Sequence, residues 1–341
     1  MKINILFEIK DGPWGGGNQF LKSLKKEFIS SGLYEEEIKK ADIVLFNSFQ
    51  EINEVIKSKK QHQDKIFVHR VDGPISLVRG KDLLIDKIIF KTNEAIADAT
   101  VFQSEWSKKM SKKLGMKPSI FETTIYNSPD KNVFSKQINK HINNKIKLVA
   151  SSWSDNPKKG FDYYKYLDEN LNFEKYEMIF IGRSPIQFKN IKMTGPLNSL
   201  EIAKIYRDSD IYVTATKDEP CSNALIEALS CGLPVVYLKS GGNPELVLNG
   251  GESFENKEEI IKKIEVIMLN YNKYLDSLPV FDIKKTAKEY LDFFESILKE
   301  KELEKYIIKN TNTVAIIKID FLLFAWIIKR FFIKIKSLIW K

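Results

Sequence analysis

The chain has 341 residues, of which 43% are hydrophobic, so it can bury a substantial core and has the length of two ordinary domains. Lysine and arginine outnumber aspartate and glutamate by 54 to 45, and the formal charge of +9 favours anionic partners such as nucleic acid, anionic lipid or phosphorylated small molecules. On a helix the two cysteines, Cys221 and Cys231, lie about 15 Å apart, and the three histidines are scattered, so the composition excludes a disulfide framework and indicates no structural metal site.

The first part of the chain alternates apolar runs of strand length with stretches of helical length. The run at residues 3–7 is too short for a secretory signal, so we expect a cytoplasmic protein. The runs are INILF, DIVLF, KIFVH and ATVFQ, with a helix from about 18 to 29 after the first. This alternation predicts a parallel sheet with crossover helices, and we assign it to a first α/β domain over residues 1–142.

Two loops of this domain follow predicted strands and carry glycines or polar groups. Residues 12–17 are glycine-rich and precede a helix that Asn18 begins or caps, although such a turn alone is weak evidence and can be merely flexible. The loop in FVHRVDGP places His69, Arg70 and Asp72 at the carboxyl edge of the sheet, where an acceptor substrate is expected. The alternative for His69 is that it caps the strand or packs in the core.

The same alternation begins again near residue 145, after a polar stretch at 135–145 that we interpret as a linker. The apolar runs are KIKLVASS, YEMIFIGR, DIYVTA and PVVYL, with helices after Gly160 and from 199 to about 207. We assign this second α/β domain to residues 143–283. Open parallel sheets bind ligands beyond the carboxyl ends of their strands, so two such domains facing each other make a cleft with ligand loops on both walls.

The segment DEPCSNALIEALSCGLPVV, residues 218–236, carries two carboxylates in contrasting positions. Ser222 or Asn223 can cap a helix, so Glu219 lies in the loop before it and Glu227 lies one to two turns inside, among small or apolar neighbours. A pyrophosphate at the helix start, with Glu219 toward a sugar and Glu227 toward a ribose diol, accounts for both carboxylates and describes a nucleotide-sugar. The alternative is that Glu219 only complements the helix dipole and Glu227 pairs with a distant lysine or arginine.

The stretch EPCSNALIEALSCGLPVVYLKSGGNPELV resembles the signature of the retaining GT-B glycosyltransferases of family four, the glycosyl transferases group 1. The resemblance is dense over residues 206–247 and looser over 1–299. It implies an α/β protein of GT-B fold, with two Rossmann-like domains that face a cleft and a nucleotide-diphosphate sugar as donor, without a cofactor. It further implies that Glu219 contacts the donor hexose, that Glu227 contacts the ribose, and that the helix start binds the donor through Ser222, Asn223 and Ala224.

The resemblance extends to the loop SSWSDNPKKG. Lys159 matches the family's diphosphate-binding lysine, with Lys158 as the neighbour that can substitute, although a solvated pair of lysines has the same pattern. Trp153 stands where the family has an arginine six residues before that lysine. Either Arg183 supplies the second cation or the phosphate clamp is weaker, and a plain surface arginine is an equally good interpretation of Arg183.

In the first domain the resemblance assigns Gly16 and Gly17 to the loop against the donor phosphates, because only glycine lets backbone approach so closely. It makes His69, with Asp72 beside it, the acceptor-side candidate. No separate carboxylate stands out as a general base, and retaining members are thought to let a donor phosphate oxygen take the acceptor proton. The Asp208-Ser209-Asp210 motif is best interpreted as a helix end before a strand, so we expect no metal requirement and no loss of activity with EDTA.

Residues 313–341 hold six basic side chains and one acidic one, a net +5 of the total +9. Their longest uncharged run, FLLFAWII, has eight residues, against about 20 needed to span a bilayer. Lys318, Lys329 and Lys336 share one helical stripe beside aromatic side chains, which predicts a helix in the membrane interface with its lysines at anionic inner-leaflet headgroups. The alternative is packing on the body or on a partner helix. We expect residues 284–300 to form a helix that returns to the first domain, followed by a basic amphipathic tail over 301–341.

These features together predict a hexosyltransferase at the cytoplasmic face of a membrane, which builds a cell-surface polysaccharide, lipopolysaccharide or glycolipid on a glycan or lipid-linked acceptor. Three alternatives remain open. A nucleotide-sugar epimerase or hydrolase would turn over without an acceptor. A non-catalytic membrane scaffold that binds a sugar nucleotide is suggested by Trp153. A nucleic-acid binder fits the charge of the tail, but the sequence has no groove-reading motif.

Overall fold

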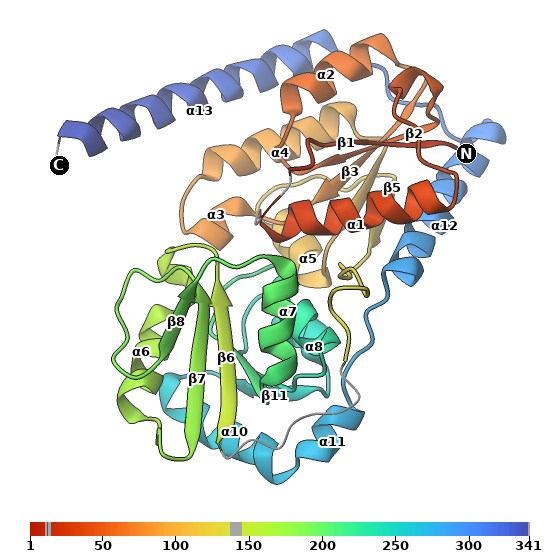
Figure 1. Cartoon of the computed structure of the whole chain (residues 1–341). Helices are drawn as coiled ribbons and strands as arrows, with labels where there is room; N and C mark the ends of the chain where they lie inside the picture. The colour runs from red at the N-terminus through yellow and green to blue at the C-terminus, as the bar shows by residue number, and fades with distance from the viewer. Residues whose placement is uncertain (11, 13–14, 137–144, 340–341) are drawn as a thin grey trace. The chain divides into compact units, whose positions relative to one another are not determined.

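The computed structural model describes residues 1–339 except 11, 13–14 and 137–144 (Figure 1). Most of the predicted linker, and the side chain of Lys336 on the predicted lysine stripe, lie outside the described part. The chain divides into two compact units. Unit 1 comprises Met1–Glu8, Phe28–Ile125 and Lys288–Lys341, and unit 2 comprises Ile9–Glu27 and Tyr126–Ala287.

The two units differ at their boundaries from the predicted domains. Residues 9–27 group with unit 2 because they contact it directly: the Lys26 ammonium lies 2.9 Å from the Asp130 carboxylate, and Gly16 packs on Asn223. The chain enters unit 2 at residue 126, earlier than the predicted boundary at 143. Local periodicity marks strands and helices, but it does not tell which sheet a connecting segment packs against.

Unit 1 is built on a five-stranded sheet in the order β1-β2-β3-β4-β5, with every neighbouring pair parallel. The strands are β1 (Ile3–Leu6), β2 (Ile43–Asn47), β3 (Ile66–Val71), β4 (Ala99–Phe102) and β5 (Phe121–Thr124). Its helices are η1 (Ile38–Lys40), α2 (Ile52–Gln61), α3 (Ile75–Arg79), α4 (Leu83–Ile96), α5 (Glu105–Lys113) and α13 (Thr313–Ile339). Two further helices, α1 (Gly16–Ser30) and α12 (Ile283–Glu302), have residues in both units.

The core of unit 1 follows the two-residue period of its strands. Leu6, Val44, Phe46 and Phe67 belong to one apolar cluster, which α2, α4 and the start of α13 complete. The helix α4 reaches this cluster because apolar residues recur along it at three- and four-residue spacing, and Ile85, Ile88, Ile89 and Ile96 are buried.

Unit 2 has a six-stranded parallel sheet in the order β11-β10-β9-β6-β7-β8. Its strands are β6 (Ile146–Ser152), β7 (Tyr176–Gly182), β8 (Lys192–Gly195), β9 (Ile211–Thr214), β10 (Val235–Leu238) and β11 (Gly251–Phe254). Its helices are η2 (Pro157–Lys159), α6 (Phe161–Asn170), α7 (Ser199–Asp208), α8 (Asn223–Ser230), α9 (Asn243–Val247), η3 (Lys257–Glu259), α10 (Ile260–Leu269) and α11 (Tyr271–Asp276). After β8 the chain returns to the other side of β6, so the strand order reverses between β6 and β9.

The helix α13 has two apolar faces. One packs along α4, with Ile316 and Ile319 buried and Trp326 partly buried. The large apolar side chains that remain exposed on this helix are Val314, Ile317, Phe321, Phe324, Ile327, Ile328, Phe331 and Phe332. The alternative that the tail packs on the body of the protein is therefore correct for one face of α13. The described residues leave the other face of α13 uncovered. Among the described residues, no helix is both long and apolar enough to cross a membrane.

Candidate active site

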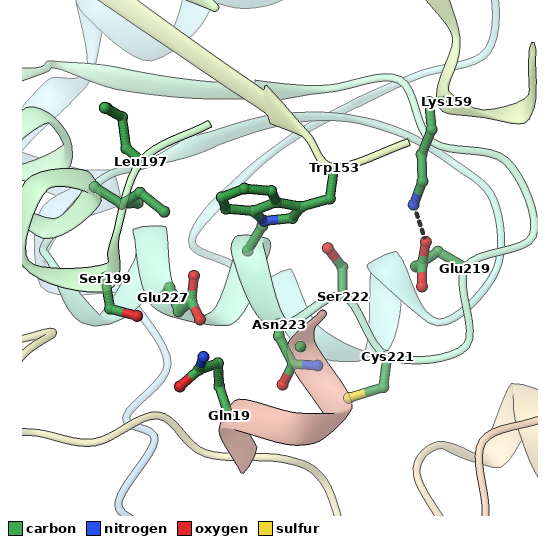
Figure 2. Close-up of a pocket in the computed structure, with 13 residues that line it drawn as sticks. Gln19, Trp153, Lys159, Leu197, Ser199, Glu219, Cys221, Ser222, Asn223 and Glu227 are labelled. Carbon is green, nitrogen blue, oxygen red and sulfur yellow. Dashed lines mark hydrogen bonds and ion pairs between the residues drawn. The ribbon is translucent and has the colours of Figure 1, made fainter. Parts of the chain in front are cut away.

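A pocket of about 130 Å³ lies in unit 2, where the strand order of the sheet reverses (Figure 2). Trp153 and Lys159 reach it from the loop after β6, and Glu219 to Glu227 reach it from the segment after β9. The start of α1 and the start of α7 supply the remaining walls. The loops at a topological switch point diverge and leave an open crevice, which is where doubly wound sheets bind their ligands.

An ion pair between Lys159 and Glu219 lies at one end of this pocket. The Lys159 ammonium donates to the Glu219 carboxylate at 2.6 Å, and both side chains are partly buried (Figure 2). Lys159 is the last residue of η2, and Gly160 follows with a φ of +77° against the backbone of Ala215. A Cβ at Gly160 would clash with that backbone, so glycine lets the lysine loop lie directly on the end of β9.

The glycine pair after β10 holds Glu219 in place. The Gly242 N–H donates to the Glu219 carbonyl at 2.8 Å, and Gly241, with a φ of +65°, packs so closely on Glu219 that a Cβ would clash. Asn243 is fully buried and its amide donates to the carbonyls of Thr216 and Leu238. The sequence marked this loop as part of a family signature, but its packing contact with Glu219 becomes visible only in the structure.

The start of α8 forms the floor of the pocket. Ser222 caps the helix, since its hydroxyl accepts the Leu225 N–H at 3.4 Å. The Asn223 side chain accepts a hydrogen bond from the Asn127 amide at 3.1 Å and packs against Gly16, where a Cβ would clash with it. Ala224 also lines the pocket. Of the residues predicted to bind the donor, the structure brings together Ser222, Asn223, Ala224 and Gly16, whereas Gly17 is absent from the lining and a Cβ there would meet open space.

Glu227 lies one turn inside α8, at the other end of the pocket from the ion pair (Figure 2). Desolvation by burial raises the pKa of its carboxyl to about 8. Within the described part of the chain this carboxylate has no ion-pair or hydrogen-bond partner, so the alternative of a pairing lysine or arginine finds no support there. A partly buried carboxylate without a protein partner, facing a pocket, is suited to accept hydrogen bonds from a ligand.

The cations of the predicted phosphate clamp separate in the structure. Lys159 lines the pocket, but the Lys158 ammonium is engaged by the Asp218 carboxylate at 2.5 Å and lies outside the lining. Arg183 is exposed and is not among the lining residues either. Trp153 lines the pocket at the place where the family pattern has an arginine. Of the described side chains that line this pocket, Lys159 is the sole cation.

The structure corrects the prediction for His69. Its ring is fully buried in β3, stacked on Phe46, with Nε2 2.8 Å from the Ser48 carbonyl and Nδ1 3.2 Å from the Asn93 amide. Burial lowers the pKa of His69 to about 4, so the ring is neutral. A ring with no exposed surface and two occupied nitrogens cannot touch a substrate, and the core alternative is the one observed.

Asp72 lies in a polar cluster at the carboxyl ends of β2, β3 and β4. Arg70, fully buried, donates to Asp72 at 2.9 Å, and the amides of Asn47 and Gln103 also donate to the Asp72 carboxylate. This is the sheet edge at which the sequence predicted an acceptor-side loop. The carboxylate keeps about a quarter of its surface exposed, so it stays accessible to a ligand.

The aspartates of the DxD motif lie at the opposite edge of the sheet of unit 2. Asp208 ends α7 and pairs with the Lys147 ammonium at 2.6 Å, while Asp210 accepts the Lys147 backbone N–H at 2.8 Å. Both therefore fix the start of β6. Among the described residues, no cluster of three or more histidine, cysteine or acidic side chains could hold a metal ion.

Comparison with known proteins finds a family match over most of unit 2. Residues 133–277 match the family described as Glycosyl transferases group 1. A curated relative, "Probable sucrose-phosphate synthase" of Thermosipho melanesiensis, is 24% identical over 242 residues, which cover 62% of this chain and 56% of that protein. Spore coat protein SA of Bacillus subtilis is 27% identical over 143 residues, 40% of this chain and 34% of that one. The chain spans little more than half the length of the first of these relatives and about a third of the second.

Solved structures extend the similarity to most of the chain. Sucrose-phosphate synthase from Thermosynechococcus elongatus has a TM-score of 0.70 at 12% identity, covering 88% of this chain and 100% of that one. HepE from Anabaena has a TM-score of 0.67 at 15% identity, covering 87% of this chain and 100% of that one. At such identity the likeness shows the fold. The chain therefore has the GT-B fold with its two Rossmann-like domains, and its residues 133–277 match the Glycosyl transferases group 1.

Proposed function

We propose that the protein is a retaining hexosyltransferase that uses a nucleotide-diphosphate sugar as donor. The observation that carries this proposal is the pocket at the switch point of unit 2, which joins Lys159 and Glu219 at one end to Glu227 at the other, across the start of α8. These three titratable groups come from the loop after β6 and from the segment after β9 that includes the start of α8, and they line one crevice. Along the pocket, Glu219 with Lys159, the start of α8 and Glu227 follow one another as the sugar, the diphosphate and the ribose do in such a donor.

The diphosphate belongs at the start of α8. Backbone N–H groups and the positive end of the helix dipole favour an anion there, and Lys159 supplies a full positive charge beside it. As the bond between the sugar and the diphosphate breaks, negative charge grows on the leaving oxygen. The loop that carries Lys159 is held on the end of β9 by Gly160, so this cation needs little rearrangement of the backbone to stabilise that charge.

The two glutamates accept hydrogen bonds from the hydroxyl groups of the donor. Glu219 gives up or shares its contact with Lys159 and accepts hydrogen bonds from the hexose, while Glu227 accepts both hydroxyls of the ribose diol. The acceptor hydroxyl attacks the anomeric carbon from the side of the leaving diphosphate, and its proton passes to a phosphate oxygen of that diphosphate. This path needs neither a separate carboxylate base nor a metal ion, so EDTA should leave the activity unchanged.

Structural neighbours support the donor class. HepE of Anabaena was solved with UDP and glucose and with UDP-glucose, and a starch synthase catalytic domain from Arabidopsis thaliana was solved with ADP and acarbose. For the acceptor, we propose a glycan or a lipid-linked glycan of cell-surface polysaccharide or glycolipid synthesis, bound near Asp72. The exposed apolar face of α13 supports a location at the cytoplasmic face of a membrane.

The test of the donor site is thermal unfolding of the purified chain with UDP, GDP, ADP and their sugars. A ligand at about 100 times its dissociation constant stabilises the folded state by about 2.7 kcal/mol. We expect one nucleotide class to raise the unfolding temperature of wild type and of Glu258→Ala, an exposed carboxylate of unit 2, but not of Glu227→Ala. No shift with any nucleotide, or an unchanged shift in Glu227→Ala, contradicts the proposed site.

One observation favours a second function. Because Trp153 lines the pocket in place of an arginine, the clamp has a single lysine, as a non-catalytic sugar-nucleotide-binding scaffold would tolerate. Release of free nucleoside diphosphate separates the possibilities. Release that requires added membrane lipids or glycan indicates a transferase. Release in their absence indicates a hydrolase, and tight donor binding without release under either condition indicates the scaffold.

A further inference from the structure

A second hollow lies in unit 1, far in sequence from the donor pocket, and the proposed function does not use it. Its volume is about 600 Å³, and its walls come from α3, the start of α4 and the second half of α13. Figure 1 shows α13 running along α4 and continuing past it. The start of α13 lies beside the end of α4, whereas Trp326, Arg330 and Phe331 lie beside its start, so the two helices run antiparallel.

The charged groups of this hollow are mainly cations. Arg79, Lys81 and Arg330 line it together with one carboxylate, Asp82, which lies 3.8 Å from the Arg79 guanidinium. The Arg79 guanidinium lies over the ring of Phe49, 5.6 Å from its centroid, and that of Arg330 lies 4.9 Å from the centroid of Trp326. A guanidinium that stacks on an aromatic face directs its N–H groups outward in its own plane, a geometry that suits the binding of a phosphate. Three positive charges against one negative charge leave an excess of two.

The hollow borders the exposed apolar face of α13. Phe331 lines the hollow and is itself 61% exposed, so it belongs to both. A pocket for an anion beside a row of exposed phenylalanines and isoleucines has the two chemistries of a phospholipid, a phosphate headgroup and acyl chains. Nucleic acid or free phosphate would account for the arginines but would leave the apolar face uncovered.

We propose that this hollow binds the phosphate of an anionic membrane phospholipid, with Arg79, Lys81 and Arg330 as the phosphate-binding residues and the exposed face of α13 against the acyl chains. This proposal rests on the membrane contact that is part of the proposed function, and it adds to that contact a specific site for a lipid headgroup. The lipid then fixes the depth and rotation of α13, because one anchored headgroup beside Phe331 limits how the helix can turn in the interface.

The experiment is vesicle co-sedimentation of the full chain. Three vesicle types are compared: phosphatidylcholine alone, phosphatidylcholine with phosphatidylglycerol, and phosphatidylcholine with oleate at the same surface charge. The variant Arg79→Gln/Arg330→Gln removes two charges from the hollow. The control Lys87→Gln/Lys318→Gln removes two exposed charges of α4 and α13 outside it. We expect wild type and control to prefer phosphatidylglycerol to oleate, and the hollow variant to lose that preference.

If lipid attraction is only diffuse, the loss of each basic residue near the surface weakens vesicle binding by roughly fivefold, and both variants lose the same affinity. We expect the hollow variant to lose at least about tenfold more affinity for phosphatidylglycerol vesicles than the control. Equal losses, or equal binding to phosphatidylglycerol and oleate in wild type, overturn the proposal. Retained vesicle binding in the hollow variant, together with loss of a thermal shift by glycerol phosphate, indicates a site for soluble phosphate and also overturns it.

Failure of this proposal is distinguishable from failure of the proposed function. Nucleotide binding is measured in unit 2 and should be the same in wild type and both double variants, because all four substitutions lie in unit 1. If vesicles of every composition fail to bind wild type, the membrane contact itself is wrong. If wild type binds neutral and anionic vesicles equally, the membrane contact stands and the headgroup site is wrong.

Discussion

In the proposed donor site, Glu227 should make nucleotide binding dependent on pH. Its carboxyl must be ionised to accept both hydroxyls of a ribose, yet burial raises its pKa to about 8 in the protein without ligand. Binding of a nucleotide below pH 8 therefore releases a proton. We expect the affinity to rise by up to about tenfold per pH unit from pH 7 to pH 8 and to level off above that value. Calorimetric titrations between pH 7 and pH 9 avoid the phosphate ionisation near pH 6.

The same carboxyl affects the stability of the protein without ligand. A raised pKa in the folded state means that the folded chain binds more protons than the unfolded chain between about pH 4.5 and pH 8. Stability therefore falls as pH rises through this window, by at most about 1.4 kcal/mol per unit. Glu227→Gln should remove both this slope and the pH dependence of nucleotide affinity. A nucleotide affinity that is equally pH-dependent in wild type and in Glu227→Gln would show that another group is responsible.

The two adjacent glycines of α1 should respond in opposite ways to alanine. A Cβ at Gly16 would clash with the Asn223 side chain at the start of α8, whereas one at Gly17 meets no atom. Gly16→Ala should weaken nucleotide binding by displacing Asn223. Gly17→Ala should bind normally and gain up to about 1 kcal/mol in stability, since alanine is the better helix former. Nucleotide-induced thermal shifts of the two variants check this, and weaker binding in Gly17→Ala than in Gly16→Ala contradicts it.

At this scale the sequence placed the residues that line the pocket of unit 2 more accurately than it placed His69. Glu219, Glu227 and Lys159 lie in short segments whose strand and helix boundaries are local, so their spacing was sufficient to place them. His69 was misplaced because exposure at a strand end depends on what packs over it, here Phe46 and the Asn93 side chain of α4. Gly16 and Gly17 were indistinguishable, since their difference arises from a contact with a residue two hundred positions away.

Among the elements, the segment between α12 and α13 is held to unit 1 by one buried carboxylate. Asp98, between α4 and β4, accepts hydrogen bonds from the Tyr306 hydroxyl at 2.7 Å and the Lys309 N–H at 2.8 Å. It also accepts the Phe67 N–H and lies 3.2 Å from the fully buried Lys59 ammonium. Burial lowers the pKa of Lys59, so this lysine depends on Asp98 to remain charged.

Asp98→Ala should therefore destabilise unit 1 strongly. The substitution leaves the Lys59 ammonium buried without its partner. Such a change removes roughly 3–5 kcal/mol from the free energy of unfolding. Tyr306→Phe removes only one hydrogen bond of the same cluster and should remove about 1–2 kcal/mol. Urea unfolding of both variants measures the difference. If Asp98→Ala is no worse than Tyr306→Phe, the buried pair does not fasten this segment.

The arrangement of elements was predictable as far as it is periodic. The eight predicted strands and the helices α1, α7 and α12 begin and end within a few residues of their predicted positions, whereas β5, β8 and β11 were not predicted. The periodicity of apolar residues does not tell which other element packs against each face of a helix. The tail reads as amphipathic with one apolar face, but α13 has two, and the face that contains Ile316 and Ile319 completes the core of unit 1. For the same reason residues 9–27 join unit 2 rather than unit 1.

For the whole molecule, the proposed membrane contact depends on the uncovered face of α13. Phe321 and Phe324 lie on that face, away from the side that packs on α4, so replacing both by glutamate should leave the fold intact. The variant exchanges apolar contact with the membrane for repulsion from anionic lipid, and we expect binding to phosphatidylglycerol vesicles to fall at least about a hundredfold. Leu269→Glu/Val280→Glu, which replaces two isolated exposed residues of unit 2, is the matched control and should bind as wild type does.

The same pair of variants tests whether membrane attachment and chemistry are separable. The donor pocket lies within unit 2 and α13 lies within unit 1, so Phe321→Glu/Phe324→Glu should bind nucleotide normally and transfer sugar to a water-soluble acceptor. Transfer to an acceptor embedded in vesicles should fall in parallel with vesicle binding, because the loss is one of local concentration. If transfer to both acceptors falls equally, α13 supports the catalytic conformation of the protein and does not act as a membrane anchor.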